Sequence, residues 1–212
     1  MIASEGRVIL IPLFLISIAC IVVYFIFPLL VFKWINIFLF VLLTFSAYFF
    51  RDPKRENIKK DGFVSPADGK IIQIIDIDDP EVGDSKQISI FLSVFNVHSQ
   101  YVPYTSKVIS KEYIPGKFLV AFNEKSSLDN EQTSVIFETN DGIKYKINQI
   151  AGLIARRILN YMEIDMMAIR GERLGFIRFG SRVDIILPNS FKLNIKEGDI
   201  VIGNSTIIGL FK

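Results

Sequence analysis

One stretch decides how this chain is interpreted: Gly175-Phe176-Ile177-Arg178-Phe179-Gly180-Ser181-Arg182-Val183-Asp184. Its second half opens the apolar run Val183 to Leu187, which predicts a buried strand. The Gly-Ser pair lies just before that strand. Gly180 suits a strained backbone position, and Ser181 can act as a nucleophile only if a base lies beside it. The rest of the sequence has to supply that base.

Composition limits the candidates. The chain has 212 residues, 50% of them hydrophobic, and most of the apolar excess lies before Arg51. A net charge of +2 without a basic stripe argues against a nucleic-acid partner. The single cysteine, Cys20, lies in an apolar segment, and no zinc-type spacing occurs, so we expect neither a disulfide framework nor a metal site. His98 is the only histidine and hence the one obvious base at neutral pH.

Two apolar runs, Val8–Phe32 and Trp34–Phe50, each approach the ~20 residues needed to cross a bilayer. We expect residues 1–50 to form a helical membrane hairpin with two spans; one span followed by an interfacial or re-entrant segment is the alternative. No small-residue cleavage site follows the first run, which argues against a signal peptide. Basic residues precede the anchor and recur in the linker 51–60, so the positive-inside rule places the remaining domain on the cytoplasmic face of the inner membrane.

Residues 61–212 alternate short apolar runs with turn signals. Strands are expected at residues 71–77, 86–94, 107–113, 134–139 and 143–150. Asn140-Asp141-Gly142, between the last two, is a strong hairpin signal. The segment 152–162 is expected to be either a short helix or another strand. We therefore predict a mainly β fold, a compact antiparallel barrel or sandwich preceded by the helical membrane hairpin.

Several polar residues are candidates for a site. Asp68 lies in a Pro- and Gly-containing turn before the first strand, where its carboxylate can either cap that turn or serve a site. His98 follows the strand 86–94 and can be either a core residue or a catalyst. Arg156 and Arg157 can be a solvated pair or an anion contact.

The order of several motifs resembles that of phosphatidylserine decarboxylases of the short, single-chain-precursor type. These motifs are Arg51-Asp52-Pro53, Ser65-Pro66-Ala67-Asp68-Gly69-Lys70, Asn96-Val97-His98, Pro115-Gly116-Lys117-Phe118, Asn130-Glu131, Ile150-Ala151-Gly152-Leu153 and Phe179-Gly180-Ser181. The resemblance covers nearly everything from Arg51 to the C-terminus. The family's longer members carry a second histidine three residues after the first, whereas this sequence has Tyr101 there, so the role of that second histidine is not carried over.

The resemblance implies a proenzyme that cleaves itself between Gly180 and Ser181 into chains 1–180 and 181–212, which remain together as a heterodimer. The Ser181 hydroxyl would add to the Gly180 carbonyl while His98 takes its proton and Asp68 orients the imidazole. Elimination then releases the larger chain, and residue 181 becomes a pyruvoyl group. The cofactor would thus derive from Ser181, with no pyridoxal phosphate and no metal.

The resemblance also implies the reaction of the mature enzyme. The pyruvoyl group would form a Schiff base with phosphatidylserine in the bilayer and accept electrons as carbon dioxide leaves, giving phosphatidylethanolamine. His98 would return a proton to the α-carbon. Candidates for binding the substrate carboxylate or phosphate are Arg156, Arg157, Arg178 and Arg182. The sequence leaves open whether a higher oligomer forms through apolar strand edges.

Two other functions are possible interpretations, but each explains fewer of the sequence motifs than the decarboxylase resemblance does. A membrane-bound serine hydrolase would use Asp68, His98 and Ser181, but Ser181 lacks Gly-x-Ser-x-Gly surroundings and Gly180 would have no purpose. A non-enzymatic, membrane-anchored β-barrel adaptor or carrier-like module is suggested by Lys196-Glu197-Gly198-Asp199-Ile200-Val201, although no modifiable lysine lies at a turn tip.

Overall fold

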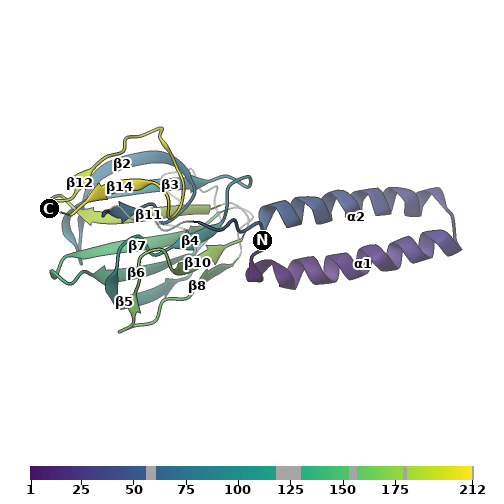
Figure 1. The fold of residues 1–212 in the computed structure, drawn as a ribbon, viewed down its shortest axis with the longest axis horizontal. Helices are drawn as coiled ribbons and strands as arrows, with labels where there is room; N and C mark the ends of the chain where they lie inside the picture. The colour runs from purple at the N-terminus through teal and green to yellow at the C-terminus, as the bar shows by residue number, and fades with distance from the viewer. Residues whose placement is uncertain (56–60, 118–129, 153–156, 179–180, 212) are drawn as a thin grey trace. The chain divides into compact units, whose positions relative to one another are not determined.

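The computed structural model describes residues 1–55, 61–117, 130–152, 157–178 and 181–211. The chain divides into two compact units, Met1–Lys54 and Arg55–Lys212. The first is helical and the second is built of strands (Figure 1).

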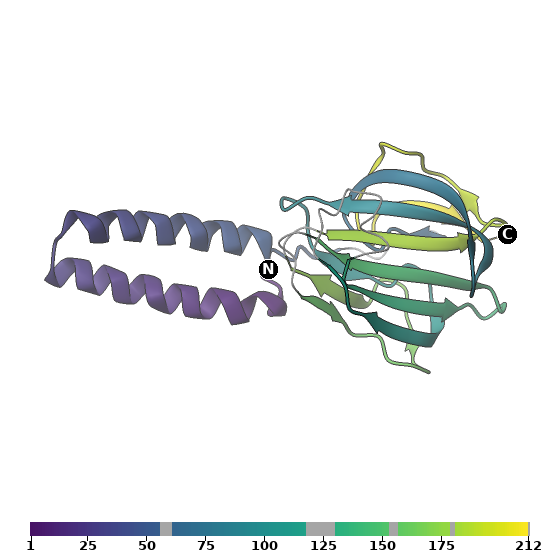
Figure 2. The ribbon, with the colours of Figure 1, turned by 180° about the vertical axis from the view of Figure 1, so that it is seen from behind.

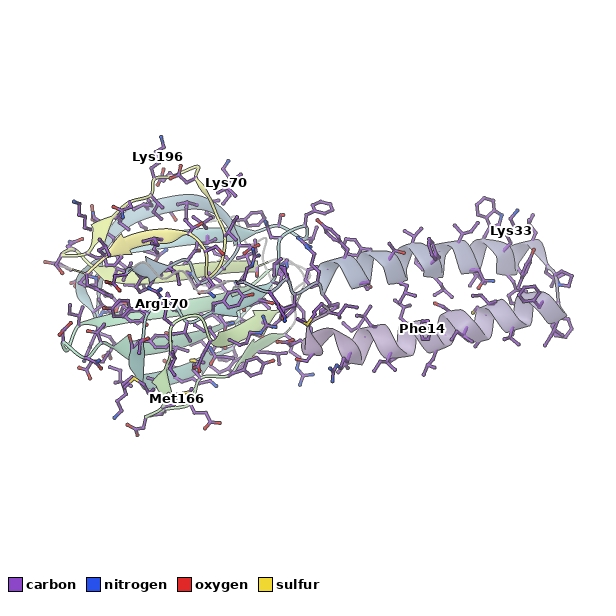
Figure 3. All side chains as sticks on the ribbon, in the orientation of Figure 1. Phe14, Lys33, Lys70, Met166, Arg170 and Lys196 are labelled. Carbon is purple, nitrogen blue, oxygen red and sulfur yellow. The ribbon has the colours of Figure 1, made fainter. Side chains whose placement is uncertain are left out.

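The first unit is a hairpin of two helices, α1 (Arg7–Ile26) and α2 (Leu30–Phe49), preceded by a 3-10 turn, η1 (Ser4–Gly6). Each helix is long and apolar enough to cross a membrane, and most of its side chains are exposed. A helix that is apolar all round suits lipid surroundings better than one face of a soluble core. Figure 3 shows Lys33 near the turn that joins the two helices.

Backbone hydrogen bonds close the open end of the hairpin. The Ala3 N–H donates to the Phe50 carbonyl at 2.7 Å, and the Asp52 N–H donates to the Met1 carbonyl at 2.7 Å. Phe49 and Phe50 are fully buried beside these bonds. The expected helical hairpin is thereby confirmed, and its two ends lie side by side.

The second unit is organised around one curved antiparallel sheet, seen from both sides in Figures 1 and 2. Its described strands lie in the order β13 (Ile200–Val201), β2 (Gly69–Asp79), β3 (Gly83–Leu92), β11 (Ser181–Pro188), β7 (Lys144–Ala151), β6 (Gln132–Glu138), β5 (Ser106–Ile114) and β9 (Met167–Ala168). The central strand β11 pairs with β3 on one side and with β7 on the other. Every residue of β11 except Pro188 is buried.

Two smaller antiparallel sheets accompany the large one. One has the order β4 (Ser99–Tyr101), β10 (Arg173–Ile177) and β8 (Ile158–Asn160); the other has the order β1 (Phe63–Val64), β14 (Ile207–Leu210) and β12 (Lys192–Leu193). Apolar residues from all three sheets form one core, to which β11 contributes Val183, Ile185 and Leu187. The prediction of a mainly β, antiparallel domain is confirmed.

The individual strand predictions agree with the structure except at their ends. The β6–β7 hairpin turns at Asn140-Asp141-Gly142, where Gly142 has a φ of 77°, a value that favours glycine. The strand expected over 86–94 ends at Leu92, because Ser93 to Asn96 form a turn. In the segment 152–162, residues 158–160 form strand β8, while 153–156 lie outside the described residues.

Candidate active site

Ser181 is the first residue of β11, at one end of the large sheet. It lies between Leu92, the last residue of β3, and Ala151, the last residue of β7. Its side chain is fully buried, and its Oγ has no hydrogen-bond partner among the described residues. A buried hydroxyl usually has a partner, so an unpaired one points to a reactive or ligand-binding role. Gly180, the preceding residue, lies outside the described residues.

Alternation along the strand sets the direction of the Ser181 side chain. Successive residues of a strand face opposite sides of the sheet, so Ser181 shares a face with Val183 and Ile185. Both of these residues belong to the apolar core. The Ser181 hydroxyl therefore lies on the inner face of the curved sheet.

His98 is fully buried and immediately precedes β4. Its Nδ1 lies 3.0 Å from the carbonyl oxygen of Asn96. Because a carbonyl can only accept, Nδ1 must carry the proton, and the neutral ring then has its lone pair on Nε2. Nε2 is therefore the nitrogen that can act as a base.

The Asn96 carbonyl is held in place by a closed turn. The Asn96 Oδ1 accepts from the backbone N–H of Ser93 at 2.9 Å and from its hydroxyl at 2.8 Å, and the Asn96 N–H donates to the Ser93 carbonyl at 2.9 Å. This turn fixes the group that selects the histidine tautomer. Asn96 was not predicted to have this role, although Ser and Asn three residues apart are a recognisable turn signal.

Contacts between the sheets bring β4 against the inner face of the large sheet. Gln149 Nε2, on β7, donates to Gln100 Oε1, on β4, at 3.0 Å. Gln149 pairs with Val183, two residues after Ser181 on the same face. Gln100 lies two residues after His98 and therefore on the same side of the chain.

Strand β10 sets the direction from Gln100 toward His98. Gly175 pairs with Gln100, and further along the same strand the Ile177 N–H donates to the His98 carbonyl at 3.4 Å. From Ile177 the chain continues within a few residues to Ser181. The single histidine and the predicted nucleophile therefore lie toward the same end of the domain, and their joint action in one site stays a prediction.

Asp68 reaches this region through the segment that precedes β2. The Val64 N–H donates to the Pro103 carbonyl at 3.0 Å and the Tyr101 N–H to the Pro66 carbonyl at 2.8 Å. Residues 66–68 then form a bend that carries Asp68 into the start of β2. Tyr101, at the position of the longer members' second histidine, is buried and helps to hold this segment through its backbone.

The Asp68 carboxylate is buried and paired. Its Oδ2 accepts from Arg55 Nη2 at 2.7 Å, and its Oδ1 accepts from the Gly203 N–H at 2.8 Å. A buried carboxylate remains charged when a cation and hydrogen-bond donors compensate the lost hydration. A Cβ at Gly203 would lie 3.2 Å from this same Oδ1, so glycine keeps the approach open. Arg55 and Gly203 are partners that the sequence analysis missed.

The predicted substrate-binding arginines have different surroundings. Arg182 is buried on the opposite face of β11 from Ser181, where its Nε donates to Asp184 at 2.6 Å and its Nη2 to Ser89 at 2.6 Å. Arg157 is exposed and Arg178 half-buried, and the Arg178 N–H donates to the Arg157 carbonyl at 3.2 Å. Arg156 lies outside the described residues.

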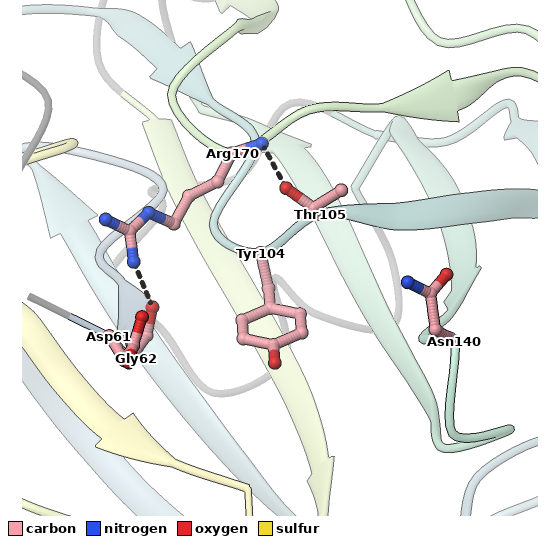
Figure 4. A pocket seen from close by; sticks show the side chains of 6 residues that line it. All are labelled: Asp61, Gly62, Tyr104, Thr105, Asn140 and Arg170. Atoms are coloured by element: carbon pink, nitrogen blue, oxygen red, sulfur yellow. Dashed lines mark hydrogen bonds between the residues drawn. The ribbon is translucent and has the colours of Figure 1, made fainter. Parts of the chain in front are cut away.

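A polar pocket of about 330 Å³ lies elsewhere in this unit (Figure 4). Arg170 crosses it, with Nη1 donating to the Gly62 carbonyl at 3.0 Å and the backbone N–H donating to the Thr105 hydroxyl at 3.1 Å. Its wall includes Asn140, in the β6–β7 turn, at the opposite end of the sheet from Ser181. This pocket is separate from the candidate active site. Among the described residues, no three His, Cys, Asp or Glu side chains form a metal-binding group.

Known proteins share this sequence over most of its length. The profile of the phosphatidylserine decarboxylase family matches residues 42–209. The phosphatidylserine decarboxylase proenzyme of Geotalea daltonii is 44% identical over 175 residues, which cover 82% of each chain. The proenzyme of Chlorobium chlorochromatii is 40% identical over 194 residues, which cover 91% of each chain. This chain therefore belongs to the phosphatidylserine decarboxylase family.

Proposed function

We propose that this chain is a proenzyme that cleaves itself between Gly180 and Ser181 and then decarboxylates phosphatidylserine to phosphatidylethanolamine. The observation that carries the proposal is the placement of Ser181. Its hydroxyl is buried, lacks a partner in the described structure and lies toward the same end of the domain as the only histidine. The names of the relatives support both the precursor state and the lipid substrate.

The first step is an acyl shift within the backbone. The Ser181 Oγ adds to the Gly180 carbonyl carbon, the peptide C–N bond breaks, and the Gly180 acyl group passes from nitrogen to oxygen as an ester. The hydroxyl proton goes to a base and the freed nitrogen takes up a proton. Neutral His98 is suited to this exchange because the Asn96 carbonyl leaves Nε2 as its basic nitrogen.

Asp68 provides a fixed negative charge beside this exchange. An imidazole that accepts a proton becomes a cation, and a carboxylate nearby stabilises it. Arg55 and the Gly203 N–H hold that carboxylate in position, so no rearrangement is needed as the charge develops.

Loss of the α-proton of residue 181 expels the Gly180 carboxylate, and hydrolysis of the resulting enamine releases ammonia and leaves a pyruvoyl group. The described residues fit this group, since residue 181 begins a buried strand and its side-chain oxygen has no competing hydrogen-bond partner among them. The pyruvoyl group supplies an electron sink for decarboxylation, as pyridoxal phosphate does in other enzymes. Leu92 and Ala151 hold residue 181 from both sides. His98 then delivers a proton to the substrate α-carbon.

The two cleaved chains would remain associated through the large sheet. The smaller chain, 181–212, begins with β11, whose neighbours β3 and β7 both belong to the larger chain. Separating the chains would break both ladders and expose the core side chains of β11.

The apolar hairpin would anchor the enzyme where its substrate resides. A diacyl lipid leaves the bilayer only at a cost of about 0.8 kcal/mol for each CH₂ exposed, so an interfacial enzyme has easier access to the headgroup. The basic residues that flank the hairpin support a catalytic domain on the cytoplasmic face of the inner membrane. Arg157 and Arg178 remain candidates for headgroup contacts, together with Arg156, whereas the partners of Arg182 favour a structural role.

Mass spectrometry of the purified full-length protein tests the proposal. We expect two polypeptides divided after Gly180, with residue 181 blocked to Edman sequencing and convertible to a stable adduct by an amine and borohydride. Detergent-solubilised protein should release carbon dioxide from phosphatidylserine. An intact single chain with full decarboxylase activity would refute the cleavage step, and a cleaved protein without that activity would refute the substrate assignment.

A further inference from the structure

Three amide side chains, two of them fully buried and one half-buried, form a hydrogen-bonded chain that ends beside the candidate active site. Asn160 Nδ2 donates to Gln149 Oε1 at 2.8 Å, and Gln149 Nε2 donates to Gln100 Oε1 at 3.0 Å. Gln100 and Gln149 are fully buried. We call these three side chains the amide relay. The sequence analysis singled out none of them.

Backbone groups fix the direction of the amide relay. The Met162 N–H can only donate, and it bonds to Asn160 Oδ1 at 3.0 Å, which makes the other Asn160 atom the donating nitrogen. Gln149 must then accept from Asn160 and donate onward. The Leu159 carbonyl, which can only accept, lies 3.4 Å from Gln149 Nε2 and requires the same orientation.

It follows that Gln100 must present its nitrogen at the end of the relay. Its Oε1 is occupied by the Gln149 donor, and its Nε2 is buried with no partner among the described residues. Leaving a buried amide donor unpaired costs about as much as a lost hydrogen bond, so a group held this way calls for an acceptor, which a bound ligand can supply. Gly175 makes room for the arrangement, because a Cβ there would lie 2.6 Å from Gln149 Nε2.

The position of this donor selects the ligand. Gln100 lies on the same side of β4 as His98, and its partner Gln149 lies one inward-facing position along the sheet from Ser181. Two successive inward-facing positions of a strand are about 7 Å apart, a distance comparable to the length of a serine headgroup. A neutral donor here complements an anionic oxygen, which the headgroup offers in both its carboxylate and its phosphate.

We propose that Gln100 is a substrate-binding residue whose Nε2 donates a hydrogen bond to an anionic oxygen of the phosphatidylserine headgroup. The proposal rests on the function proposed above and adds a residue that recognises the substrate. A neutral amide also suits this position better than an arginine, because a cation beside His98 would oppose the protonation of the imidazole.

Replacement of Gln100 by Glu tests the proposal with little change of shape. One carboxyl oxygen still accepts from Gln149, whereas the unpaired donor becomes an acceptor. We expect the cleaved, full-length variant in mixed micelles to show a KM for phosphatidylserine raised tenfold to a hundredfold, with a smaller change in kcat. The KM should recover toward low pH, since a protonated carboxyl donates again. Gln87→Glu is the matched control, because Gln87 lies half-buried on the opposite face of the sheet and should leave KM unchanged.

Competition by phosphatidylethanolamine identifies the oxygen. This product keeps the phosphate of the substrate but lacks its carboxylate. If Gln100→Glu weakens inhibition by the product as much as it raises the KM for phosphatidylserine, Gln100 bonds to the phosphate. If the KM rises and the inhibition is unchanged, Gln100 bonds to the carboxylate. A variant that is cleaved and shows wild-type KM at every pH would overturn the proposal, as would a loss confined to kcat. Should Gln100→Glu fail to accumulate folded, Gln100→Leu provides the same KM comparison. Inactive wild-type protein would instead refute the proposed function itself.

Discussion

The two faces of strand β11 carry buried polar groups of opposite kinds. On the outer face, the Arg182 guanidinium bonds to Asp184 through Nε and to Ser89 through Nη2, while its Nη1 has no partner among the described residues. On the inner face, Ser181 Oγ and the Gln100 end of the amide relay have no partner among the described residues. The paired groups fix the strand, whereas the unpaired groups are available for chemistry. Neighbouring residues such as Ser181 and Arg182 can therefore have unrelated roles.

Ser181→Ala should produce the largest effect, because it removes the hydroxyl that is proposed to attack the Gly180 carbonyl. We expect no cleavage and no decarboxylation, measured by gel mobility and carbon dioxide release. Ser89→Ala, which removes a buried hydroxyl from the outer face, is the matched control and should still be cut. Cleavage of Ser181→Ala at the wild-type rate would assign the nucleophile elsewhere.

Arg182→Leu should reduce stability more than catalysis. It leaves the buried Asp184 carboxylate without its cation, and breaking such a pair costs about 3–5 kcal/mol in the free energy of unfolding. Urea denaturation of the catalytic unit within the full chain measures this loss.

Adding Asp184→Leu should restore most of the lost stability, because apolar replacement of both partners removes the uncompensated charge. If Arg182→Leu kept wild-type stability and instead raised the KM for phosphatidylserine, Arg182 would bind substrate, as the sequence analysis allowed.

Asn160→Asp should have an intermediate effect that acts at a distance. The new carboxylate cannot donate to Gln149 Oε1, so the Gln149 amide turns over, and Gln100 must then direct its nitrogen toward Gln149. We expect the KM for phosphatidylserine to rise, as in Gln100→Glu, but by about tenfold or less. Unchanged KM would show that the direction of the relay does not control the Gln100 donor.

Asp79→Asn should give the smallest effect, a loss of stability at neutral pH that disappears as the pH becomes acidic. Burial alone would raise the pKa of Asp79, but hydrogen bonds from Lys146 and from the backbone N–H groups of Glu81 and Val82 outweigh it and lower that pKa. The ionised carboxylate therefore adds stability, on the order of 1 kcal/mol, above its unfolded pKa of about 3.9. That contribution is lost as the pH falls through the lower folded pKa.

Chemical denaturation of wild type and Asp79→Asn between pH 2 and 7 tests this dependence. The stability difference should stay constant above about pH 5 and shrink below about pH 4. A difference that grew on acidification would contradict the lowered pKa.

Local sequence patterns were sufficient to predict the scaffold. The apolar N-terminal runs gave the helical hairpin, and the turn at Asn140 gave the β6–β7 hairpin, since both depend on neighbours in the chain. The motifs around Asp68, His98 and Ser181 indicated the family, and the roles of these three residues in the site stay predictions. The structure then placed His98 and Ser181 toward one end of the domain.

Contacts between distant strands could not be predicted in the same way. The hydrogen bond between Gln100 and Gln149 depends on how β4 packs against the large sheet. The residues next to Gln100 and Gln149 in the sequence do not indicate this packing. The ion pair between Asp68 and Arg55 could not be predicted for the same reason, because the two residues are 13 positions apart in the sequence. Strand β8 was left open between helix and strand, because its short apolar run has no clear period.

The central position of β11 would give the proposed cleavage an unusual outcome. A newly made chain end ordinarily frays and exchanges with solvent. The end made at residue 181 would instead be bordered by β3 and β7 and covered by the core. The cut would thus create a terminus with the order of a mid-strand residue, and the group that it carries would be positioned by backbone pairing laid down before the bond was broken. Maturation would then require no refolding.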